Sequence, residues 1–388
     1  MKVCVVAEYY PRRHDPVLGV WAHRQALAAR DAGADVKVLV LERPIPPASS
    51  LRRPWRLPAA LARIARQPAA DTLDGIEVRY VRFTAGSRER TYATWHESAQ
   101  APLGEALAQL RAEWPFDLIH AHYALPAGGA ALPFAREHGL PLVVSVHGGD
   151  VLGPLLQTGE ARTAVAEVLR AGAEVLCNSR ATLARVAALV PSDERLRVVY
   201  LGAAAPPEPV PKRPSTTVAT VAHVIARKRH IDVLEAIAGL ADPVDWLVIG
   251  DGPELPALRA RAAALRLDER VHFAGRLPPD EALRELASAH VMALPSVDEA
   301  FGVAYIEALA CGVPAIGCAG EGAEEIAAAG PGVLLVPPRD PAALSEAIMH
   351  AVRDPELPAQ ARHTAAAHFS WQRCGRGTVA AYRDALAG

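Results

Sequence analysis

The sequence predicts an α/β protein with two doubly wound parallel-sheet domains that face each other across a central cleft. Three observations lead to this prediction. Short apolar runs of strand character alternate with amphipathic helical stretches along the 388 residues. The apolar runs are continuous, as expected for parallel strands that helices cover on both faces. A proline-rich stretch without periodicity divides the pattern into two parts of similar size.

The apolar runs give the expected strands in order. In the first part they are 2–7, 36–41, 76–81, 118–121, 141–146, 174–178 and 196–200. In the second part they are 217–222, 245–249, 270–273, 290–294, 313–317 and 332–336. Amphipathic stretches between them predict helices, for example 20–33, 160–171, 254–266 and 340–353.

Residues 205–215 read APPEPVPKRPS, and their five prolines predict a linker. We therefore expect an N-terminal domain at 1–205, a linker at 206–214 and a C-terminal domain at 215–370. The final stretch, 371–388, predicts a helix that packs back towards the N-terminal domain. Ligands of such sheets bind at the carboxyl ends of the strands, so two facing sheets would enclose a binding cleft.

The composition narrows the class of protein. The net charge is −2 and the isoelectric point is about 6.7, which argues against a dedicated nucleic-acid binder. Five scattered cysteines without a Cys-x-x-Cys pair indicate a reduced, cytoplasmic protein. The N-terminus runs directly into a strand, so no signal peptide is expected. The apolar run 301–320 has membrane-span length, but a Cys-Gly-Val-Pro turn inside it predicts buried core.

The strongest chemical signal is the segment 291–314, in which a strand, a loop and a helix follow one another. Glu299 lies in the loop, Gly302 lies at the expected helix start, and Glu307 lies inside the helix. Free N–H groups at a helix start suit a diphosphate, and carboxylates on either side suit sugar hydroxyls. The alternative is a solvent-facing loop acid plus a helix acid paired with an arginine.

A second signal is a basic loop between a strand and a helix in 217–237, with Arg227, Lys228 and Arg229. The chain has only four lysines, so one at this place is unlike ordinary surface charge. A compact ammonium suits a leaving diphosphate. The alternative, a basic helix start, would be unfavourable against the helix dipole.

A third signal is LVIGDGPEL at 247–255, where Gly250 follows a strand. It lacks the third glycine of a dinucleotide fingerprint, and no phosphate-binding loop of the GxxxxGK type occurs anywhere in the sequence, so neither a dehydrogenase nor a P-loop protein is indicated.

The N-terminal half contributes histidines and a glycine at strand ends. VSVHGGDV at 144–151 ends a strand with His147, and HAHYALPAG begins with His120 and His122. We expect only one of His120 and His122 to face the cleft. No third ligand accompanies them, so no metal site is expected. The loop at 8–24 places Gly19 just before the first helix.

The three C-terminal segments, in this order, resemble family-4 retaining glycosyltransferases, which have two Rossmann-like domains in the GT-B architecture. The resemblance is close over 217–340 and looser over the N-terminal half. It implies transfer of a hexosyl group from a nucleoside-diphosphate sugar, with UDP favoured over GDP, to an acceptor hydroxyl. It implies no metal and no cofactor besides the donor. The acceptor would be a glycan, a lipid-linked precursor or a small molecule, in cell-wall, capsule or other polysaccharide or glycoconjugate assembly.

The resemblance also implies roles in the C-terminal domain. Glu307 would bind the ribose hydroxyls, Glu299 would bind the hexose hydroxyls, and Lys228 would neutralise the leaving diphosphate. Arg276 falls where the family contacts the base. The remaining donor-binding positions are the backbone amides of Phe301, Gly302 and Val303 and the turn at Gly250.

Further roles follow in the N-terminal domain, together with one departure from the family pattern. His147 would lie against the transferred sugar, and Gly19 would let the backbone approach the donor phosphate or the acceptor. The family usually has an arginine where this sequence has His223. Arg227 is the candidate for the second positive charge of the phosphate clamp.

Two other activities stay open at this stage. One is a nucleotide-sugar epimerase on the same architecture, and the other is a catalytically weak protein that only binds sugar nucleotides, given His223. A sugar phosphorylase is disfavoured because Lys228 and Lys212 are the only lysines of the C-terminal half that could hold a pyridoxal group.

The segment 51–66 carries five arginines and no acid, with Trp55 near its start. Leu57, Leu61 and Ile64 fall on one helical face, which is typical of a helix resting on an anionic membrane surface. The hypothesis is a peripheral protein on the inner face of the membrane that takes a lipid-linked acceptor. The alternative is a solvated surface helix.

Overall fold

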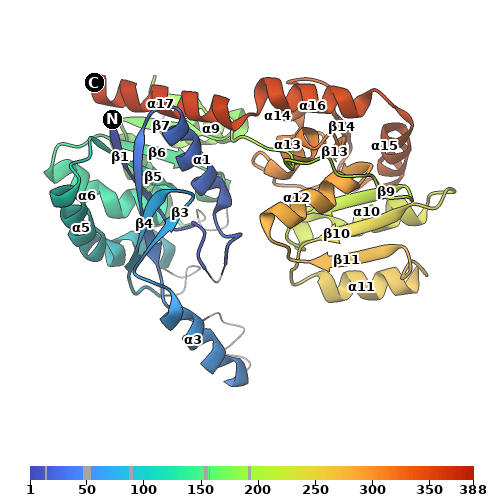
Figure 1. The fold of residues 1–388 in the computed structure, drawn as a ribbon, viewed down its shortest axis with the longest axis horizontal. Helices are drawn as coiled ribbons and strands as arrows, with labels where there is room; N and C mark the ends of the chain where they lie inside the picture. Colours follow the sequence, from blue (N-terminus) through green and yellow to red (C-terminus); the bar gives the residue numbers. More distant parts are fainter. Residues whose placement is uncertain (14, 47–53, 87–90, 153–155, 157, 191–193) are drawn as a thin grey trace. The chain divides into compact units, whose positions relative to one another are not determined.

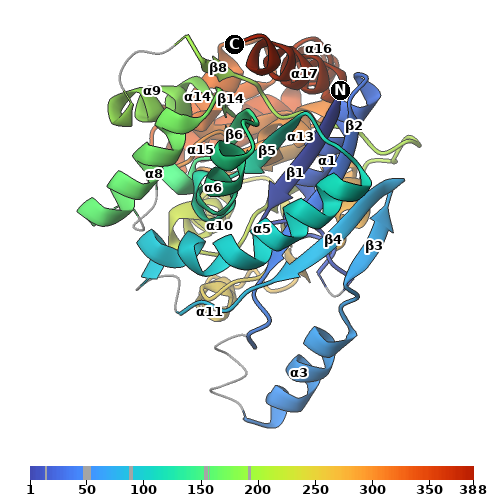
Figure 2. The same ribbon diagram turned by 90° about the vertical axis from the view of Figure 1, so that its left-hand side faces the viewer.

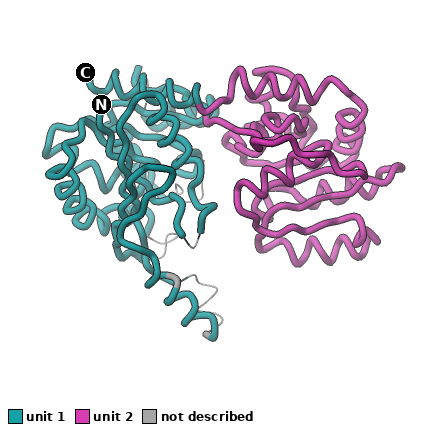
Figure 3. The backbone as a smooth tube through the Cα atoms, in the orientation of Figure 1, with its two compact units in different colours: residues 1–200, 372–388 teal, residues 201–371 magenta. Residues whose placement is uncertain are grey.

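The structure is a computed structural model that describes residues 1–13, 15–46, 54–86, 91–152, 156, 158–190 and 194–388. The described chain forms two compact units, coloured separately in Figure 3. Unit 1 comprises Met1–Tyr200 and Gln372–Gly388, and unit 2 comprises Leu201–Trp371. The segment 206–214, expected as a linker, thus falls within unit 2. Each unit has its own parallel sheet, which confirms the predicted α/β fold class.

Unit 1 contains an eight-stranded sheet (Figure 1). Its strands are β1 (Lys2–Ala7), β2 (Asp35–Glu42), β3 (Ala70–Leu73), β4 (Ile76–Arg82), β5 (Leu118–His122), β6 (Leu142–Val146), β7 (Glu174–Cys177) and β8 (Leu196–Val198). Its α-helices are α1 (Val20–Asp31), α3 (Leu57–Arg66), α5 (Trp95–Glu113), α6 (Gly129–Glu137), α7 (Gly149–Leu152), α8 (Gly159–Ala171), α9 (Arg180–Leu189) and α17 (Trp371–Ala387). Short helical turns are η1 (Pro54–Arg56), η2 (Tyr92–Thr94) and η3 (Ala124–Gly128).

The sheet of unit 1 has the strand order β3-β4-β2-β1-β5-β6-β7-β8 and is parallel except for β3. The β3 strand pairs antiparallel with β4 across the turn formed by Asp74 and Gly75, which both have positive φ. No strand was expected at β3. The signal was an Asp-Gly pair, which favours the tight turn of a two-residue hairpin.

The C-terminal helix α17 packs on unit 1, next to α1 in Figure 1. Gln25 of α1 donates a hydrogen bond of 3.1 Å to the hydroxyl of Thr378, and both side chains are buried. A Cβ atom on Gly375 would lie 2.1 Å from the carbonyl oxygen of Ala28, so only glycine permits this helix–helix approach. The helix expected at 371–388 therefore forms and completes the core of the unit that contains the N-terminus.

Unit 2 contains a six-stranded, wholly parallel sheet. Its strands are β9 (Thr217–Val221), β10 (Asp245–Ile249), β11 (Val271–Gly275), β12 (Val291–Ala293), β13 (Ala315–Cys318) and β14 (Val333–Val336). Its helices are η5 (Ala226–Lys228), α10 (His230–Ala238), α11 (Leu255–Ala264), α12 (Pro279–Ser288), α13 (Val303–Ala310), α14 (Gly322–Ala327), α15 (Pro341–Arg353) and α16 (Leu357–His368). Their apolar faces bury a core around Trp246.

The strand order of unit 2, β11-β10-β9-β12-β13-β14, reverses direction between β9 and β12. In unit 1 the corresponding reversal lies between β1 and β5. Loops that leave neighbouring strands at such a point diverge, so ligands bind there in open parallel sheets. The basic loop with Lys228 follows β9 and the loop with Glu299 follows β12, so the strand order explains why these two segments meet. Gly250 follows β10, which is adjacent to β9, and His147 follows β6, which is adjacent to β5.

The arginine-rich segment forms α3, which projects from the body of unit 1 in both ribbon views (Figures 1 and 2). Trp55 is 74% exposed and Leu61 is 49% exposed, whereas Leu57 and Ile64 are half-buried. Arg52 and Arg53, and the side chain of Arg63, lie outside the described residues. Within the described ranges, no helix combines the length and the apolar character needed to cross a bilayer.

Candidate functional site

Unit 2 brings the two charged segments together at the carboxyl ends of β9 and β12. The amide of Val297 donates a hydrogen bond of 2.9 Å to the carbonyl of Arg227, which joins the two loops through their backbones. Arg227 also donates from its guanidinium to the carbonyl of Asp298 over 3.3 Å. The positions of the basic and acidic side chains are therefore fixed by the sheet and by backbone hydrogen bonds.

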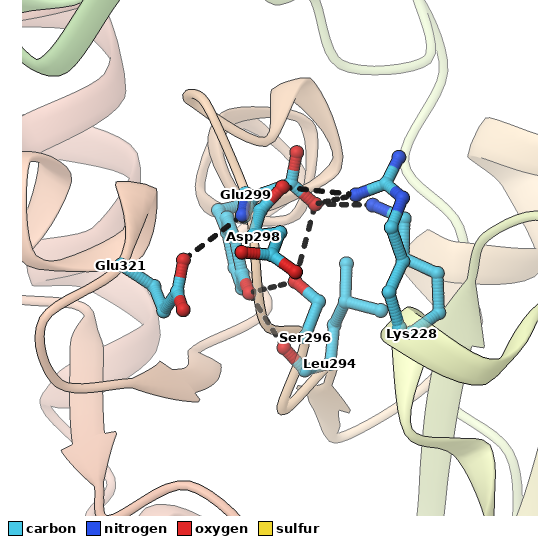
Figure 4. A network of polar contacts seen from close by, with 8 residues as sticks. Lys228, Leu294, Ser296, Asp298, Glu299 and Glu321 are labelled. Atoms are coloured by element: carbon cyan, nitrogen blue, oxygen red, sulfur yellow. Dashed lines mark hydrogen bonds and ion pairs between the residues drawn. The ribbon is translucent and has the colours of Figure 1, made fainter. Parts of the chain in front are cut away.

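Glu299 is the centre of a polar network, drawn in Figure 4. Its carboxylate forms an ion pair with the ammonium of Lys228, and the guanidinium of Arg227 lies 3.8 Å from the same oxygen. The hydroxyl of Ser296 donates to that oxygen over 3.1 Å, and the carboxylate of Glu321 accepts from the Glu299 amide over 2.9 Å. Lys228 and Glu299 were predicted as parts of two separate signals, and the structure pairs them.

The Lys228–Glu299 pair is largely withdrawn from water, because the side chains are only 12% and 10% exposed. Burial lowers the pKa of the Lys228 ammonium, and the Glu299 carboxylate opposes this shift by favouring the charged form. Arg227 adds a smaller lowering through repulsion. The site therefore holds a partly desolvated cation that depends on a nearby anion to remain charged.

The helix start expected at Gly302 is found there, since Gly302 is the N-cap of α13 and has a φ of 82°. No side chain among the described residues caps this helix, and its first turn contains no acid. A Cβ atom on Gly302 would lie 3.4 Å from Cγ of Glu299. The N–H groups of Val303 and the following residue thus open beside the Lys228–Glu299 pair, which suits an anion. The Phe301 side chain is buried in the core.

The other donor-site candidates lie at nearby strand ends. The amide of Gly250, after β10, donates to the carbonyl of Gly275 over 2.8 Å, which places the turn before Arg276 beside it. Arg276 and His223 are exposed, and Glu307 is half-buried on α13. A Cβ atom on Gly250 would lie 1.9 Å from the carbonyl oxygen of Ala222. The chain's own packing therefore already requires glycine at this position.

Three further residues of unit 2 were missed by the sequence analysis. The hydroxyl of Tyr305 donates to the carbonyl of Leu294 over 2.5 Å and lies 3.2 Å from the hydroxyl of Ser296. Burial raises the pKa of Tyr305 far above its ordinary range, so it stays neutral. Ser296 donates to the Glu299 carboxylate, Tyr305 lies within hydrogen-bond distance of Ser296, and Glu321 accepts from the Glu299 amide. Sequence spacing gave no sign of Glu321, which is 22 residues away from Glu299.

In unit 1, His147 follows β6 and meets the histidines of β5. Its Nε2 lies 2.9 Å from Nδ1 of His122, and the two rings are stacked. That only one of His120 and His122 faces the cleft stays a prediction, but both side chains lie on one face of β5. Residues two apart in a strand share a face, and the two rings lie 4.6 Å apart.

All three histidines are neutral at physiological pH. Burial lowers the pKa of His147 and of His120 to about 3, and it lowers the pKa of His122 well below its ordinary value. Both nitrogens of His120 are used, by Tyr382 at 2.7 Å and by Ser145 at 2.8 Å. In the His122–His147 pair one ring must donate and the other accept, so the tautomer of His147 depends on His122.

Asp150 fixes the backbone around His147. It is fully buried, and its carboxylate accepts from the amides of His147 and Ala124, each at 3.2 Å. Burial raises the pKa of Asp150 to about 6, and the backbone hydrogen bonds act in the opposite direction. Asp150 thus ties the loop after β6 to the loop after β5, and it positions His147 without contacting its ring.

Gly19 is the N-cap of α1 with a φ of 67°. A Cβ atom there would lie 2.1 Å from the backbone of Tyr9, so the loop after β1 can fold onto the helix start only with glycine. This close approach of two chain segments is a sufficient reason for the residue type. No cluster of three or more His, Cys, Asp or Glu side chains suited to a metal occurs among the described residues.

Comparison with known families matches both halves of the chain. The family model "Glycosyltransferase Family 4" matches residues 3–204, and "Glycosyl transferases group 1" matches residues 206–368. A protein of Bacillus subtilis (strain 168) named for teichuronic acid biosynthesis, the glycosyltransferase TuaC, is 27% identical over 90% of this chain and 88% of its own length. D-inositol 3-phosphate glycosyltransferase of Acidothermus cellulolyticus is 29% identical over 72% of this chain and 71% of its own.

Solved structures share the fold at low sequence identity. Sucrose-phosphate synthase of Thermosynechococcus elongatus aligns with a TM-score of 0.78 at 19% identity over 100% of this chain and 99% of its own. HepE of Anabaena, in complex with UDP and glucose, aligns with a TM-score of 0.73 at 18% identity over 99% of both chains. The chain therefore belongs to glycosyltransferase family 4, a family of retaining enzymes that use nucleotide-sugar donors.

Proposed function

We propose that this enzyme transfers a hexosyl group from a nucleoside-diphosphate sugar, with UDP as the first candidate and GDP as the second, to an acceptor hydroxyl. The observation that carries the proposal is the Lys228–Glu299 pair beside the open start of α13. A diphosphate can accept hydrogen bonds from the N–H groups at the start of α13, and the positive charge of Lys228 can pair with it. HepE, a protein of the same fold, was solved with UDP and glucose, which supports UDP.

The donor would be held along one line of residues. Glu307 binds the ribose hydroxyls, the amides of Phe301, Gly302 and Val303 bind the diphosphate and sugar, and Glu299 binds hexose hydroxyls. Gly250 and Arg276 lie next to the nucleobase of the donor. In this arrangement the diphosphate competes with Glu299 for Lys228, so donor binding exchanges one anionic partner of Lys228 for another. Arg227, 3.8 Å from Glu299, is the second cation within reach.

The reaction would proceed on one face of the sugar. The bond between the anomeric carbon and the diphosphate oxygen breaks, the acceptor oxygen bonds to the same carbon from the same side, and a phosphate oxygen takes the acceptor's proton. Lys228 and the start of α13 stabilise the charge of the departing diphosphate. His147, which is neutral, contributes as a hydrogen-bonding group against the transferred sugar and carries no charge.

Nucleotide release tests the activity directly. A thermal-shift screen of UDP-glucose, UDP-N-acetylglucosamine, UDP-galactose and GDP-mannose identifies the donor, and the free nucleotide is then measured with and without acceptor. Release that requires acceptor supports a transferase. Release without acceptor, or conversion of one sugar nucleotide into another, would point to hydrolysis or epimerisation instead.

Substitution of Lys228 tests its role in the leaving step. Lys228→Ala should lower turnover by about 100-fold or more and change donor affinity much less, because its charge matters most when the diphosphate departs. Arg229→Ala is the matched control, since Arg229 pairs with Asp232 over 2.6 Å instead of with Glu299. If Lys228→Ala keeps near wild-type turnover, Arg227 would be the residue that stabilises the leaving diphosphate.

For the acceptor, we propose a glycan precursor carried on lipid, used in cell-wall, capsule or related polysaccharide assembly. TuaC, a relative over most of the chain, is named for teichuronic acid biosynthesis, and the arginine-rich segment exposes Trp55 in η1 and Leu61 in α3. Each arginine near an anionic surface contributes about 1 kcal/mol, and salt screens the attraction.

Sedimentation with vesicles tests the membrane contact. Vesicles with anionic lipid should bind the protein at low salt and release it at high salt. Replacement of Arg52, Arg53, Arg56, Arg63 and Arg66 by glutamine should abolish binding. Equal lack of binding to anionic and neutral vesicles at low salt would favour an acceptor taken from solution.

A further inference from the structure

Unit 1 contains a ring of aromatic side chains that the reaction scheme above does not use, apart from His147. Tyr9 follows β1, Trp21 is the second residue of α1, Tyr123 follows β5, and His147 follows β6. Successive centroids lie 6.2 Å apart (Tyr9–Trp21), 6.2 Å (Trp21–His147), 5.2 Å (His147–Tyr123) and 5.3 Å (Tyr123–Tyr9). We call these four residues the aromatic ring cluster.

The geometry of the cluster leaves ring surface for another molecule. The four pairs are tilted by 38° to 59°, so none is a parallel stack that would cover two faces at once. All four side chains are half-buried, so each also keeps some exposed surface. Tyr123 has a φ of 77°, which is costly for a bulky residue and persists where the surroundings require it.

Two polar atoms of the cluster are buried without a hydrogen-bond partner among the described residues. They are Nε1 of Trp21, which can only donate, and Nδ1 of His147. Burying such atoms unpaired is unfavourable, and unpaired polar atoms are rare in folded proteins. A ligand that covers the aromatic faces and offers a hydroxyl group can accept from Trp21 Nε1, and a hydroxyl of a sugar held next to it can either donate to or accept from His147 Nδ1.

The side chains of the cluster carry no charge of their own, and the two arginines of the loop after β1 have partners outside the cluster. Arg12 of the loop after β1 donates to the carbonyls of Glu8 and Leu41, each at 3.2 Å, and Arg13 pairs with Asp71 at 2.9 Å. The pKa of His147 is lowered to about 3, so that ring is uncharged. The cluster thus combines aromatic faces, which carry partial negative charge and attract C–H groups, with neutral hydrogen-bonding atoms.

We propose that the aromatic ring cluster binds the acceptor through a pyranose ring, whose C–H face packs on Trp21 and Tyr9 while one of its hydroxyls accepts from Trp21 Nε1, which leaves His147 Nδ1 to the transferred sugar. This proposal rests on the proposed transferase function and narrows its acceptor to a carbohydrate. The acceptor hydroxyl is then held beside His147. An acyclic hydroxy acid lacks the C–H face and would add a negative charge that the neutral cluster does not balance.

The test uses simple methyl glycosides as probes. Saturation-transfer-difference NMR measures the binding of the methyl pyranosides of glucose, galactose, mannose and N-acetylglucosamine to the full chain. Malate serves as the acyclic anionic probe. We expect at least one pyranoside to receive saturation, mainly at the C–H protons of one ring face. Malate should neither receive saturation nor displace the pyranoside.

Two tryptophan variants provide the matched comparison. Trp21→Leu should weaken pyranoside binding at least tenfold, which corresponds to about 1.4 kcal/mol. Trp55→Leu removes an indole that is 74% exposed and outside the cluster, and it should change the affinity less than twofold. Tyr9→Leu is a second cluster variant, needed if Trp21→Leu does not fold, and it should also weaken binding.

Donor binding is measured on the same samples, so the two proposals can fail separately. Trp21→Leu should keep the thermal shift that the wild-type protein shows with its nucleotide sugar. Absence of that shift in the wild-type protein would reject the proposed donor, whatever the pyranosides do. Pyranoside binding that is absent, equal in Trp21→Leu and Trp55→Leu, or displaced by malate would overturn the carbohydrate site.

Discussion

The Lys228–Glu299 ion pair makes a quantitative prediction about the stability of unit 2. Both side chains are about nine-tenths buried. Removing one partner of a fully buried pair costs about 3–5 kcal/mol, because the other charge stays uncompensated. Glu299→Gln leaves the Lys228 ammonium with Arg227, another cation, as its nearby charge. Lys228→Met leaves the Glu299 carboxylate with Arg227 at 3.8 Å and with Ser296.

The two single variants should therefore be unequal. We expect Glu299→Gln to destabilise unit 2 by about 2–4 kcal/mol and Lys228→Met by about 1–2 kcal/mol. The double variant should cost less than the sum, because no unpaired charge remains, with a coupling energy of about 1–3 kcal/mol. The sign of the inequality depends mainly on Arg227, which attracts Glu299 and repels Lys228, and the Ser296 hydroxyl acts in the same direction by donating to Glu299.

Native-state hydrogen exchange measures this cycle in the full chain. Peptides from β9, β12 and α13 report the free energy of opening of unit 2 by itself, so unit 1 does not enter the comparison. The exposed pair of Arg261 and Glu235, with side chains 48% and 40% exposed, is the matched control in the same unit. Its coupling should stay below about 1 kcal/mol.

Two outcomes of the cycle would refute the reasoning. One is additivity of Lys228→Met and Glu299→Gln within about 0.5 kcal/mol, since independent sites behave in this way. The other is a larger loss for Lys228→Met than for Glu299→Gln, which would mean that Arg227 does not act on the pair.

Three further predictions concern single residues. Glu307→Ala should weaken nucleotide binding by about 1.5–3 kcal/mol in calorimetry, and unchanged affinity in a folded variant would remove Glu307 from the ribose site. Gly302→Ala should lower both stability and donor affinity, because a Cβ would lie 2.5 Å from the Tyr305 ring at a φ of 82°; an equally stable variant would show that the loop can shift. Asp150 has a folded-state pKa of about 6, above the ordinary 3.8, so the folded state holds the extra proton between these values and stability falls as pH rises through them. Asp150→Asn should remove this fall, about 3 kcal/mol in total, and a wild-type-minus-variant difference independent of pH from 3.5 to 7 would contradict it.

The sheets could be predicted because parallel strands leave a local signal. Continuous apolar runs such as 2–7 and 245–249 became β1 and β10 within one residue at either end. The edge strand β3 was not predicted because ADTL is short and polar, and its residues alternate between exposed and half-buried. The sequence feature that indicates β3 is the Asp74–Gly75 turn, and a search for apolar periodicity does not detect such a turn.

The pairing within the candidate site could not be predicted in the same way. Lys228 and Glu299 are 71 residues apart, and they meet because β9 and β12 are neighbours in the sheet. His120 and Tyr382 are 262 residues apart and meet because α17 returns to unit 1. Residue types at strand ends indicate which side chains take part, whereas the strand order decides which of them touch.

The glycines mark the limit of inference from motifs. Gly19 was predicted to let the backbone approach the donor phosphate or the acceptor, and Gly250 and Gly302 were predicted to bind the donor. At each of them a Cβ atom would come within 2.5 Å of another part of the chain, the backbone of Tyr9, the backbone of Ala222 and the ring of Tyr305 respectively. Internal packing and ligand binding can thus each require glycine at the same position. A glycine in a motif therefore identifies a place of close approach, and its chemical partner must come from other evidence. At Gly302 that evidence is the uncapped start of α13 beside a desolvated lysine, whereas at Gly19 and Gly250 the chain's own backbone already accounts for the residue.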